Sequence, residues 1–228
     1  MEIRKPERGE PVIIAGAGPS GLASAIALKR CGFTPVIHEA KSGVGTRWKR
    51  GMQILENFSE KEDFMEFFEK NGIEVNFFHK PIYDTVLWDS KNNSQTFKSK
   101  RPLGYFVRRG PYPESLENGL LKQVQSMGIE VKFNSRLKPG QAHIVATGPR
   151  RVDGMGKEVT FQVDMPDRMS VILDPELAPG GYAYLFVVNG EATLALALLG
   201  DYRQVDAHFE RTVKRFEELE GIRYKGGE

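Results

Sequence analysis

The chain has 228 residues, enough to bury a hydrophobic core in one large domain or two small ones. Its 32 basic and 30 acidic residues give a net charge of +2, and 40% of its residues are hydrophobic. This balance is typical of an ordinary globular protein and argues against a polyanion-binding protein or an acidic tail. The 24 glycines and 13 prolines indicate many turns but follow no Gly-X-Y period, which excludes a collagen-like chain.

The single cysteine, Cys31, can form neither an internal disulfide nor a Cys-X-X-Cys redox pair, so we expect a reducing compartment, the cytoplasm. The longest apolar runs, residues 182–188 and 192–199, are far shorter than the roughly 20 residues of a membrane-spanning helix. The histidines lack metal-ligand spacing, and neither a Gly-X-Ser-X-Gly elbow nor a P-loop is present. We therefore expect no transmembrane segment, no metal site and neither hydrolase nor phosphotransferase chemistry.

The first forty residues predict a βαβ unit. Residues 11–16 are a short β-branched run that ends in glycine, residues 19–31 are rich in Ala and Leu, and residues 34–39 are a second apolar run. Gly32 ends the predicted helix. We expect the two strands to lie parallel and adjacent, joined by a right-handed crossover.

The middle of the chain predicts a helix and then an excursion from the main sheet. Residues 59–71 have an amphipathic pattern behind a Ser59/Glu62 capping box. Residues 73–109 contain alternating runs, divided by an Asn-Asn pair, that favour antiparallel strands. Residues 105–109 would return the chain to the sheet, and a helix at 114–127 and strands at 129–133 and 143–147 are expected to follow.

The last third predicts a half-buried antiparallel sheet followed by an amphipathic helix. A hairpin turn is expected at Asn189-Gly190, and apolar residues recur at helical spacing over 205–219. The strand-like runs are residues 159–164, 170–174, 182–188 and 192–199. We expect two domains, residues 1–150, with the β excursion at about 73–109, and residues 151–228.

The glycine pattern at the start of the chain carries the strongest chemical signal. Gly16, Gly18 and Gly21 follow a predicted strand and open a helix, and Glu39 ends the next strand 18 residues later. Gly16 would allow the tight turn, Gly18 the approach of a pyrophosphate, and Gly21 close helix packing. Glu39 could accept hydrogen bonds from both ribose hydroxyls and would repel a 2′-phosphate, which leaves FAD or NAD. The alternative is a glycine-rich turn without a ligand.

Residues 12–48 (VIIAGAGPSGLASAIALKRCGFTPVIHEAKSGVGTRW) resemble the start of FAD-dependent oxidoreductases of the glutathione-reductase superfamily. In these proteins a Gly-Gly-Arg motif follows the ribose carboxylate, and the counterpart here is Gly45-Thr46-Arg47. The resemblance implies that Arg47 pairs with phosphate. A basic-aromatic cluster formed by Arg47, Trp48, Lys49 and Arg50 could also grip single-stranded nucleic acid, but the near-neutral charge balance favours phosphate or solvent.

Further segments are similar to the geranylgeranyl-reductase-like group of these flavoproteins. Residues 104–109 (GYFVRR) place Arg109 where an arginine approaches the cofactor, residues 143–148 (HIVATG) correspond to a strand end near the adenine half, and residues 179–199 resemble the substrate-domain sheet. The resemblance implies an α/β fold, a Rossmann-like βαβ FAD/NAD(P)-binding domain with a partly inserted antiparallel β-sheet substrate domain. The candidate cofactor-binding residues are Gly16, Gly18, Pro19, Ser20, Gly21, Glu39, Ala40, Arg47, Arg109, Thr147 and Gly148.

The first hypothesis is an FAD-binding oxidoreductase, geranylgeranyl-reductase-like, that acts on an apolar, isoprenoid or aromatic substrate; no residue is assigned as acid or base. The alternative is a noncatalytic or truncated dinucleotide-binding module, or one part of a split flavoenzyme completed by a C-terminal partner chain or by a homo-oligomer. It arises because the superfamily's closing Gly-Asp strand has no convincing copy, and Gly200-Asp201 is expected to be a hairpin exit. An NAD-only dehydrogenase would leave Arg47 and Arg109 without a role.

Overall fold

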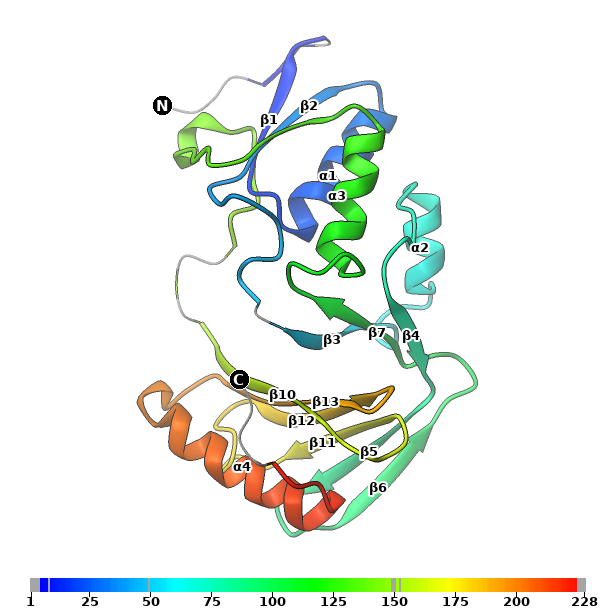
Figure 1. The fold of residues 1–228 in the computed structure, drawn as a ribbon, viewed down its shortest axis with the longest axis vertical. Coiled ribbons are helices and arrows are strands. Elements are labelled where there is room, and N and C mark those ends of the chain that lie inside the picture. Colours follow the sequence, from blue (N-terminus) through cyan, green and yellow to red (C-terminus); the bar gives the residue numbers. More distant parts are fainter. Residues whose placement is uncertain (1–4, 8, 49, 149–150, 152, 225–228) are drawn as a thin grey trace. The chain divides into compact units, whose positions relative to one another are not determined.

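The computed structural model describes the chain except residues 1–4, 8, 49, 149–150, 152 and 225–228 (Figure 1). The chain divides into two compact units. Unit 1 contains residues 1–53, 59–79 and 107–150, and unit 2 contains residues 54–58, 80–106 and 151–228. A three-stranded sheet has the order β3-β7-β4. These strands are β3 (Gly51–Glu56), β4 (His79–Ile82) and β7 (Gly104–Arg109).

Unit 1 is built on a four-stranded parallel sheet in the order β8-β2-β1-β9. Its strands are β1 (Pro11–Ala15), β2 (Thr34–His38), β8 (Glu130–Lys132) and β9 (Ile144–Val145). Strands β1 and β2 are parallel neighbours joined by a helix, so the predicted βαβ unit is confirmed. The order places the carboxyl end of β1 at the centre of the sheet edge, where α/β proteins bind their ligands.

Two helices of unit 1 lie side by side, α1 (Pro19–Arg30) and α3 (Leu116–Ser126) (Figure 1). Their apolar residues pack with alternate residues of β1 and β2 because one side of each strand faces the core. Ile14, Leu22, Ile26, Ile37 and Leu120 are almost completely buried. Helix α3 begins behind an N-cap serine whose hydroxyl accepts a hydrogen bond from the backbone N–H three residues later.

The helix expected over 59–71 is much shorter in the structure. Helix α2 spans Phe64–Lys70, and its N-cap is Asp63, whose carboxylate accepts a hydrogen bond from the Met65 backbone N–H. The predicted Ser59/Glu62 capping box is therefore wrong, because Asp63 competes for the same role next to the first apolar residues. The strand-like run at 73–78 is also not a strand.

Unit 2 contains a six-stranded sheet in the order β10-β13-β12-β11-β5-β6. Its strands are β5 (Asp84–Asp89), β6 (Ser94–Lys98), β10 (Met155–Gln162), β11 (Arg168–Leu173), β12 (Tyr182–Val188) and β13 (Glu191–Leu198). All neighbours are antiparallel except β11 and β5. The β5–β6 excursion thus joins the sheet of the last third. Asn189 and Gly190 have φ of 52° and 76°, as a tight hairpin turn requires, and the predicted hairpin is confirmed.

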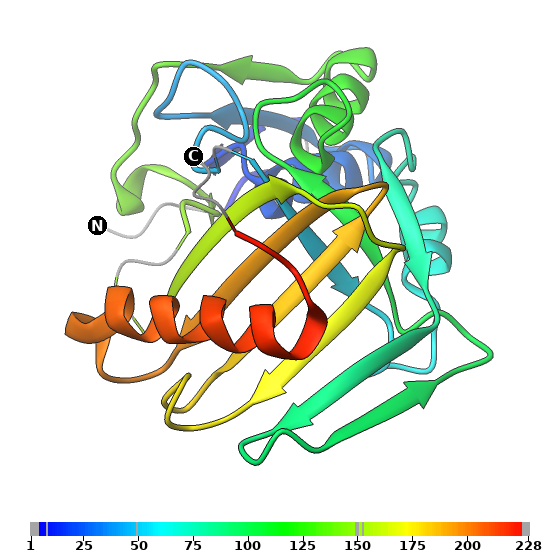
Figure 2. The same cartoon turned by 60° about the horizontal axis from the view of Figure 1, so that its bottom comes forward.

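Helix α4 (Val205–Glu220) lies across one face of this sheet (Figure 2). Phe209 and Phe216 pack into a core with Leu185, Leu194 and Leu196. Short 3₁₀ turns occur at Pro139–Gln141 and Tyr202–Gln204. The second turn follows Gly200-Asp201, which leaves the β12–β13 hairpin as predicted.

The last residue of α4 ties the helix to the sheet. Glu220, whose side chain is 3% exposed, accepts hydrogen bonds from Trp88 Nε1 at 3.0 Å and Ser170 Oγ at 2.5 Å, and it pairs with Arg168. A buried carboxylate needs such partners because its desolvation is costly. These contacts join β5, β11 and α4.

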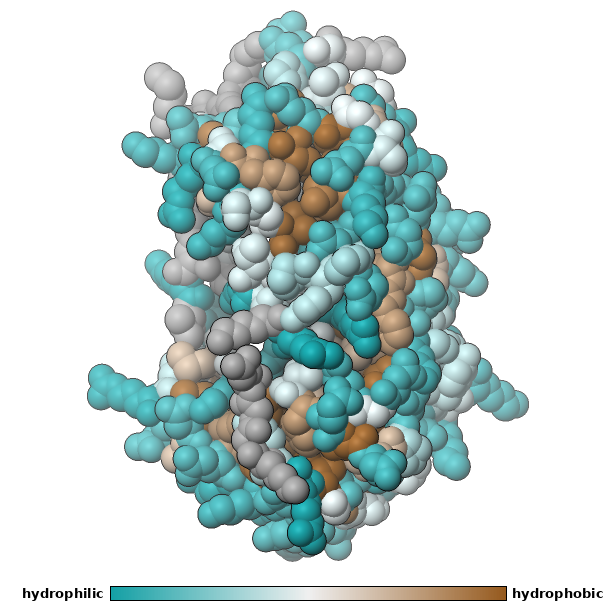
Figure 3. Space-filling model, in the orientation of Figure 1, coloured by the Kyte–Doolittle hydropathy of each residue, from teal (hydrophilic) through white to brown (hydrophobic). Residues whose placement is uncertain are grey.

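The face of the molecule drawn in Figure 3 is mainly polar. On the face drawn in Figure 3, hydrophilic residues surround separate areas of apolar side chains. Among the described residues, no helix has both the length and the hydropathy needed to cross a bilayer.

We expect Phe216→Ala to destabilise unit 2 by about 3–5 kcal/mol, because it removes a completely buried ring and leaves a cavity under the sheet. Urea unfolding should be followed by Trp88 fluorescence in a Trp48→Phe background, which restricts the tryptophan signal to unit 2. Lys214→Ala, at an exposed position of the same helix, is the matched control and should change the stability by less than about 0.5 kcal/mol. Equal effects of the two substitutions would contradict the packing described here.

Candidate functional site

The turn after β1 depends on two glycines that leave no room for a side chain. Gly16 has φ of +104°, and a Cβ atom there would lie 2.4 Å from the Ala146 carbonyl oxygen. A Cβ atom at Gly21 would lie 2.0 Å from the Gly16 carbonyl oxygen. Both distances are far below van der Waals contact, so the backbones of β1, α1 and the segment after β9 can meet only with glycine at these positions.

Gly18 differs from these two glycines because it faces open space. A Cβ atom at Gly18 would meet nothing within 4 Å. Gly18 is the N-cap of α1 and has no side chain to cap the helix, and Pro19, the first helical residue, has no N–H. The positive end of the α1 dipole therefore has no side-chain cap, an arrangement that suits an anion.

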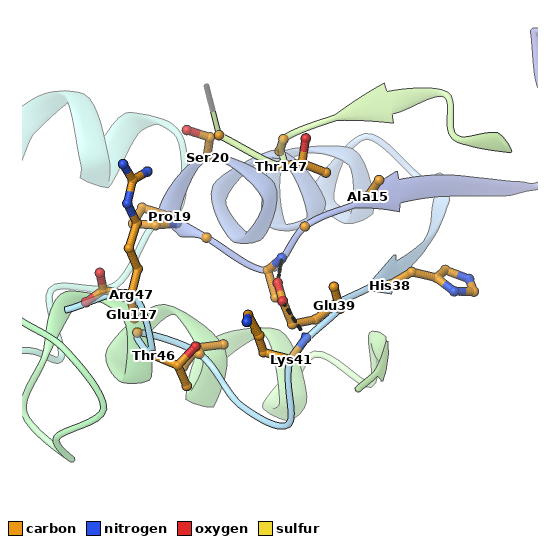
Figure 4. Close-up of a pocket in the computed structure, with 18 of the residues that line it drawn as sticks. Ala15, Pro19, Ser20, His38, Glu39, Lys41, Thr46, Arg47, Glu117 and Thr147 are labelled. Carbon is orange, nitrogen blue, oxygen red and sulfur yellow. Dashed lines mark hydrogen bonds between the residues drawn. The ribbon is translucent and has the colours of Figure 1, made fainter. Parts of the chain in front are cut away.

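Glu39 stands directly after β2 and is held by backbone donors on two sides. Its Oε2 accepts a hydrogen bond from Ala17 N and its Oε1 from Lys41 N, each at 2.8 Å (Figure 4). The carboxylate thus turns back toward the glycine turn. Each oxygen keeps a further lone pair, because an ionised carboxylate has about four acceptor sites. The group is fixed in place and can still accept two hydroxyl donors.

The loop after β8 supports Glu39 from the other side. Ser135 N donates to the Glu39 carbonyl oxygen at 2.8 Å, and Asn134 N donates to the Lys41 carbonyl oxygen at 2.9 Å. The Ser135 hydroxyl lies 2.8 Å from His38 Nδ1. Burial, and then the positive charge of Lys132, lower the pKa of the His38 imidazole. The neutral ring adds no charge beside Glu39 at neutral pH.

A group of charged and aromatic side chains forms another part of the site. Arg109 Nε donates to Glu117 Oε1 at 2.7 Å, and the Glu117 side chain is only 2% exposed. The guanidinium carbon of Arg109 is 5.2 Å from the centre of the Trp48 ring, and that of Arg47 is 5.9 Å from it. A Cβ atom at Gly148 would lie 3.5 Å from Arg47 Nη1, so Arg47 also reaches the segment after β9.

The turn after β1, Glu39 and the charged and aromatic group line one cavity of about 1280 Å³, and all of its lining residues belong to unit 1. Ten of the eleven predicted site residues line it. The exception is Gly21, which is buried behind the turn. The charged lining residues are four basic ones, Lys41, Arg47, Arg109 and Arg136, and two acidic ones, Glu39 and Glu117. The cavity is therefore basic on balance, as an anionic ligand requires.

Sequence reasoning missed Glu117 and gave Trp48 no specific role. The signal for Glu117 was an acidic residue in the first turn of the helix that follows Arg109, but pairing with an arginine cannot be inferred from that position alone. Lys49, a member of the basic-aromatic cluster, lies outside the described residues. Within the described part of the chain, no group of three or more His, Cys, Asp or Glu residues could hold a metal ion.

No protein-family profile and no curated protein sequence matches the chain. Solved structures do match it. A geranylgeranyl bacteriochlorophyll reductase-like protein from Thermoplasma acidophilum has a TM-score of 0.66 at 15% identity, over 92% of this chain and 63% of that one. CmlS, a flavin-dependent halogenase, has a TM-score of 0.65 at 14% identity, over 96% and 48%. CtdE, in complex with FAD, has a TM-score of 0.54 at 12% identity, over 92% and 68%.

At these identities the likeness establishes the fold. The chain has the mixed α/β fold of Rossmann-like FAD-binding flavoproteins, with antiparallel strands added to the parallel-sheet unit, and the predicted fold class is confirmed. The chain spans less than two thirds of the length of the reductase-like protein and about half that of the halogenase.

The two kinds of glycine in the turn should respond differently to alanine. We expect Gly21→Ala to destabilise unit 1 by about 1–3 kcal/mol through the clash with the Gly16 carbonyl, in spite of the gain in helix propensity. Gly18→Ala, where space is open, should cost about 1 kcal/mol or less. Urea unfolding followed by far-UV circular dichroism measures both. A Gly18→Ala variant less stable than Gly21→Ala would show that the turn is packed differently.

Proposed function

We propose that this protein is an FAD-binding oxidoreductase whose unit 1 cavity holds the ADP half of the cofactor. The observation that carries the proposal is the fixed Glu39 carboxylate beside the uncapped start of α1, in one basic cavity. A carboxylate that can accept two hydroxyl donors next to a helix N-terminus matches a ribose linked to a pyrophosphate. Bound FAD would supply the electron-transfer chemistry.

The cavity offers a place for each part of that half-molecule. Gly16, Gly18, Pro19 and Ser20 would face the pyrophosphate, because the turn brings backbone rather than side chains to the cavity. Glu39 and Ala40 would bind the ribose. Thr147 and Gly148, which line the cavity after β9, are proposed on the side of the adenine half, while Gly21 would act through packing alone.

The basic residues favour an anionic dinucleotide. Arg47 has no carboxylate partner among the described residues, so its charge is available to a phosphate. Arg109 is proposed to face phosphate or the flavin side. We favour FAD over NAD because two of the matched structures are named as flavin-dependent or FAD-bound and because Arg47 and Arg109 have no place in an NAD-only site.

The proposed substrate is apolar or aromatic. Tyr182, Tyr184 and Phe186 form a row on the face of β12 opposite α4, with ring centres 6.1 and 4.2 Å apart. Tyr182 is 46% exposed and could stack on a flat or apolar molecule, whereas Tyr184 and Phe186 are 8% and 4% exposed and pack inside the protein. The proposal of an isoprenoid substrate depends on the sequence resemblance to geranylgeranyl reductases. The proposal of a cytoplasmic location depends on the single cysteine.

A noncatalytic or split flavoprotein is the second candidate, and the Gly200-Asp201 segment favours it. Asp201 Oδ2 lies 2.9 Å from Nε2 of the buried His208 within unit 2, so this carboxylate already has a partner. Strand β9 is only two residues long, and Val145 is 45% exposed at that sheet edge. A C-terminal partner chain or a second copy could supply a closing strand.

We expect Glu39→Arg to weaken FAD binding by at least about 100-fold, because it removes the ribose acceptor and adds bulk and charge at the same place. The binding should be measured by calorimetry with FAD and with ADP. Glu130→Arg makes the same charge change at an exposed position of β8 and should leave both affinities unchanged. An unchanged FAD affinity in Glu39→Arg would sink the assignment of Glu39.

The purified chain should be yellow and should release FAD, at about one per chain, on denaturation, because the basic cavity retains the dinucleotide. An absorption spectrum and chromatography of the released cofactor measure this. A colourless, folded chain that also takes up no added FAD would support the noncatalytic reading. Flavin binding that appears only after addition of a C-terminal partner chain would support the split enzyme.

A further inference from the structure

The Trp48 ring lies close to two arginines at the wall of the cavity. The guanidinium carbons of Arg109 and Arg47 are 5.2 and 5.9 Å from its ring centre, within the range of cation–π attraction. The Trp48 backbone N–H donates to the Gly45 carbonyl oxygen at 3.1 Å, which closes a turn of the loop that carries the indole. All three side chains line the cavity. The indole ring can therefore attract both guanidinium groups through cation–π contacts.

Within the described part of the chain, Arg109 has a fixed carboxylate partner and Arg47 has none. Glu117 bonds Arg109 Nε at 2.7 Å and accepts the Gly110 backbone N–H at 3.3 Å on its other oxygen. A carboxylate with 2% of its side chain exposed is costly to bury unless it is paired. Its position in the first turn of α3 adds favourable helix-dipole energy. Arg109 therefore has one strongly preferred orientation.

The neighbouring residue of β7 shows what an ordinary pair looks like. Arg108 points to the other side of the strand, lies 4.9 Å from the centre of the Phe78 ring and bonds Glu114 at 2.5 Å. The Glu114 side chain is 45% exposed, and neither Arg108 nor Glu114 lines the cavity. Exposed pairs of this kind stabilise little. The Arg108–Glu114 pair is therefore a control that joins the same strand to the segment just before α3.

We propose that Glu117 is a positioning residue of the cavity. Its buried carboxylate holds the Arg109 guanidinium close to the Trp48 ring. Arg109 therefore loses little side-chain entropy when it binds an anionic ligand. A free arginine side chain gives up considerable rotamer entropy when it binds, and pre-alignment removes that cost. The inference rests on the proposed function only for the identity of the ligand. The alignment itself is a property of the protein alone.

The first experiment needs no ligand. Glu117→Gln keeps the shape of the side chain but removes its charge, so Arg109 should leave the indole, and quenching of Trp48 fluorescence by acrylamide should rise. The rise should be absent in a Trp48→Phe background, which retains only Trp88, and in the control Glu114→Gln. Unchanged Trp48 quenching in a folded Glu117→Gln variant would overturn the proposal.

The second experiment measures binding of FAD and ADP to the same variants. Glu117→Gln should weaken FAD binding about tenfold. In an Arg109→Gln background the same change should have little further effect, because Glu117 acts through Arg109. An equal loss in both backgrounds would show a general structural role and overturn the proposal. Arg109→Lys replaces Arg109→Gln if the unpaired buried Glu117 prevents folding.

The two experiments distinguish a failure of the proposed FAD-binding function from a failure of the positioning role of Glu117. A wild-type chain that binds neither FAD nor ADP would defeat the proposed function, while the fluorescence result would still decide whether Glu117 aligns Arg109. A wild-type chain that binds FAD, together with a Glu117→Gln variant of unchanged affinity, would defeat the positioning role and leave the proposed function intact.

Discussion

The close approach of three backbone segments around Gly16 is the constraint on which unit 1 depends. The turn after β1, the start of α1 and the segment after β9 meet at distances that exclude even one methyl group. Because no side chain fills this junction, the end of the parallel sheet is left with backbone donors and a cavity rather than with a packed core. The Glu39 carboxylate is held to this turn by a hydrogen bond that it accepts from Ala17 N.

In each unit, a buried carboxylate holds a helix to a neighbouring strand. In unit 1, Glu117 joins α3 to Arg109 at the end of β7. In unit 2, Glu220 joins α4 to Trp88 and to β11. Each carboxylate is almost fully buried and each has several donors, so each specifies the orientation of its partners more strongly than an apolar contact would. The charged side chains around Trp48 and the glycine turn after β1 are separate parts of the structure, and both line the same cavity.

Local signals in the chain predicted most of the fold. The βαβ unit, the Asn189-Gly190 hairpin and α4 follow from periodicity and turn chemistry, and each is present. The start of α2 could not be placed from the sequence because Ser59 and Asp63 are both good N-cap residues, and in the structure the Asp63 carboxylate caps the helix directly before Phe64. The apolar run at 73–78 predicts a strand, but no strand forms there and Phe77 packs edge-on against Phe68 of α2.

By itself, the sequence determined the fold class and the glycine turn with its acidic partner, because these depend on residues close together in the chain with a fixed local geometry. The tertiary structure alone decided that Arg47, Arg109 and Trp48 share a wall and that Glu117 holds Arg109. It also showed that Gly200-Asp201 ends a hairpin with its carboxylate next to His208. The physical reason is that ion pairs and ring contacts between distant segments are set by burial and distance, and neither is encoded in local spacing.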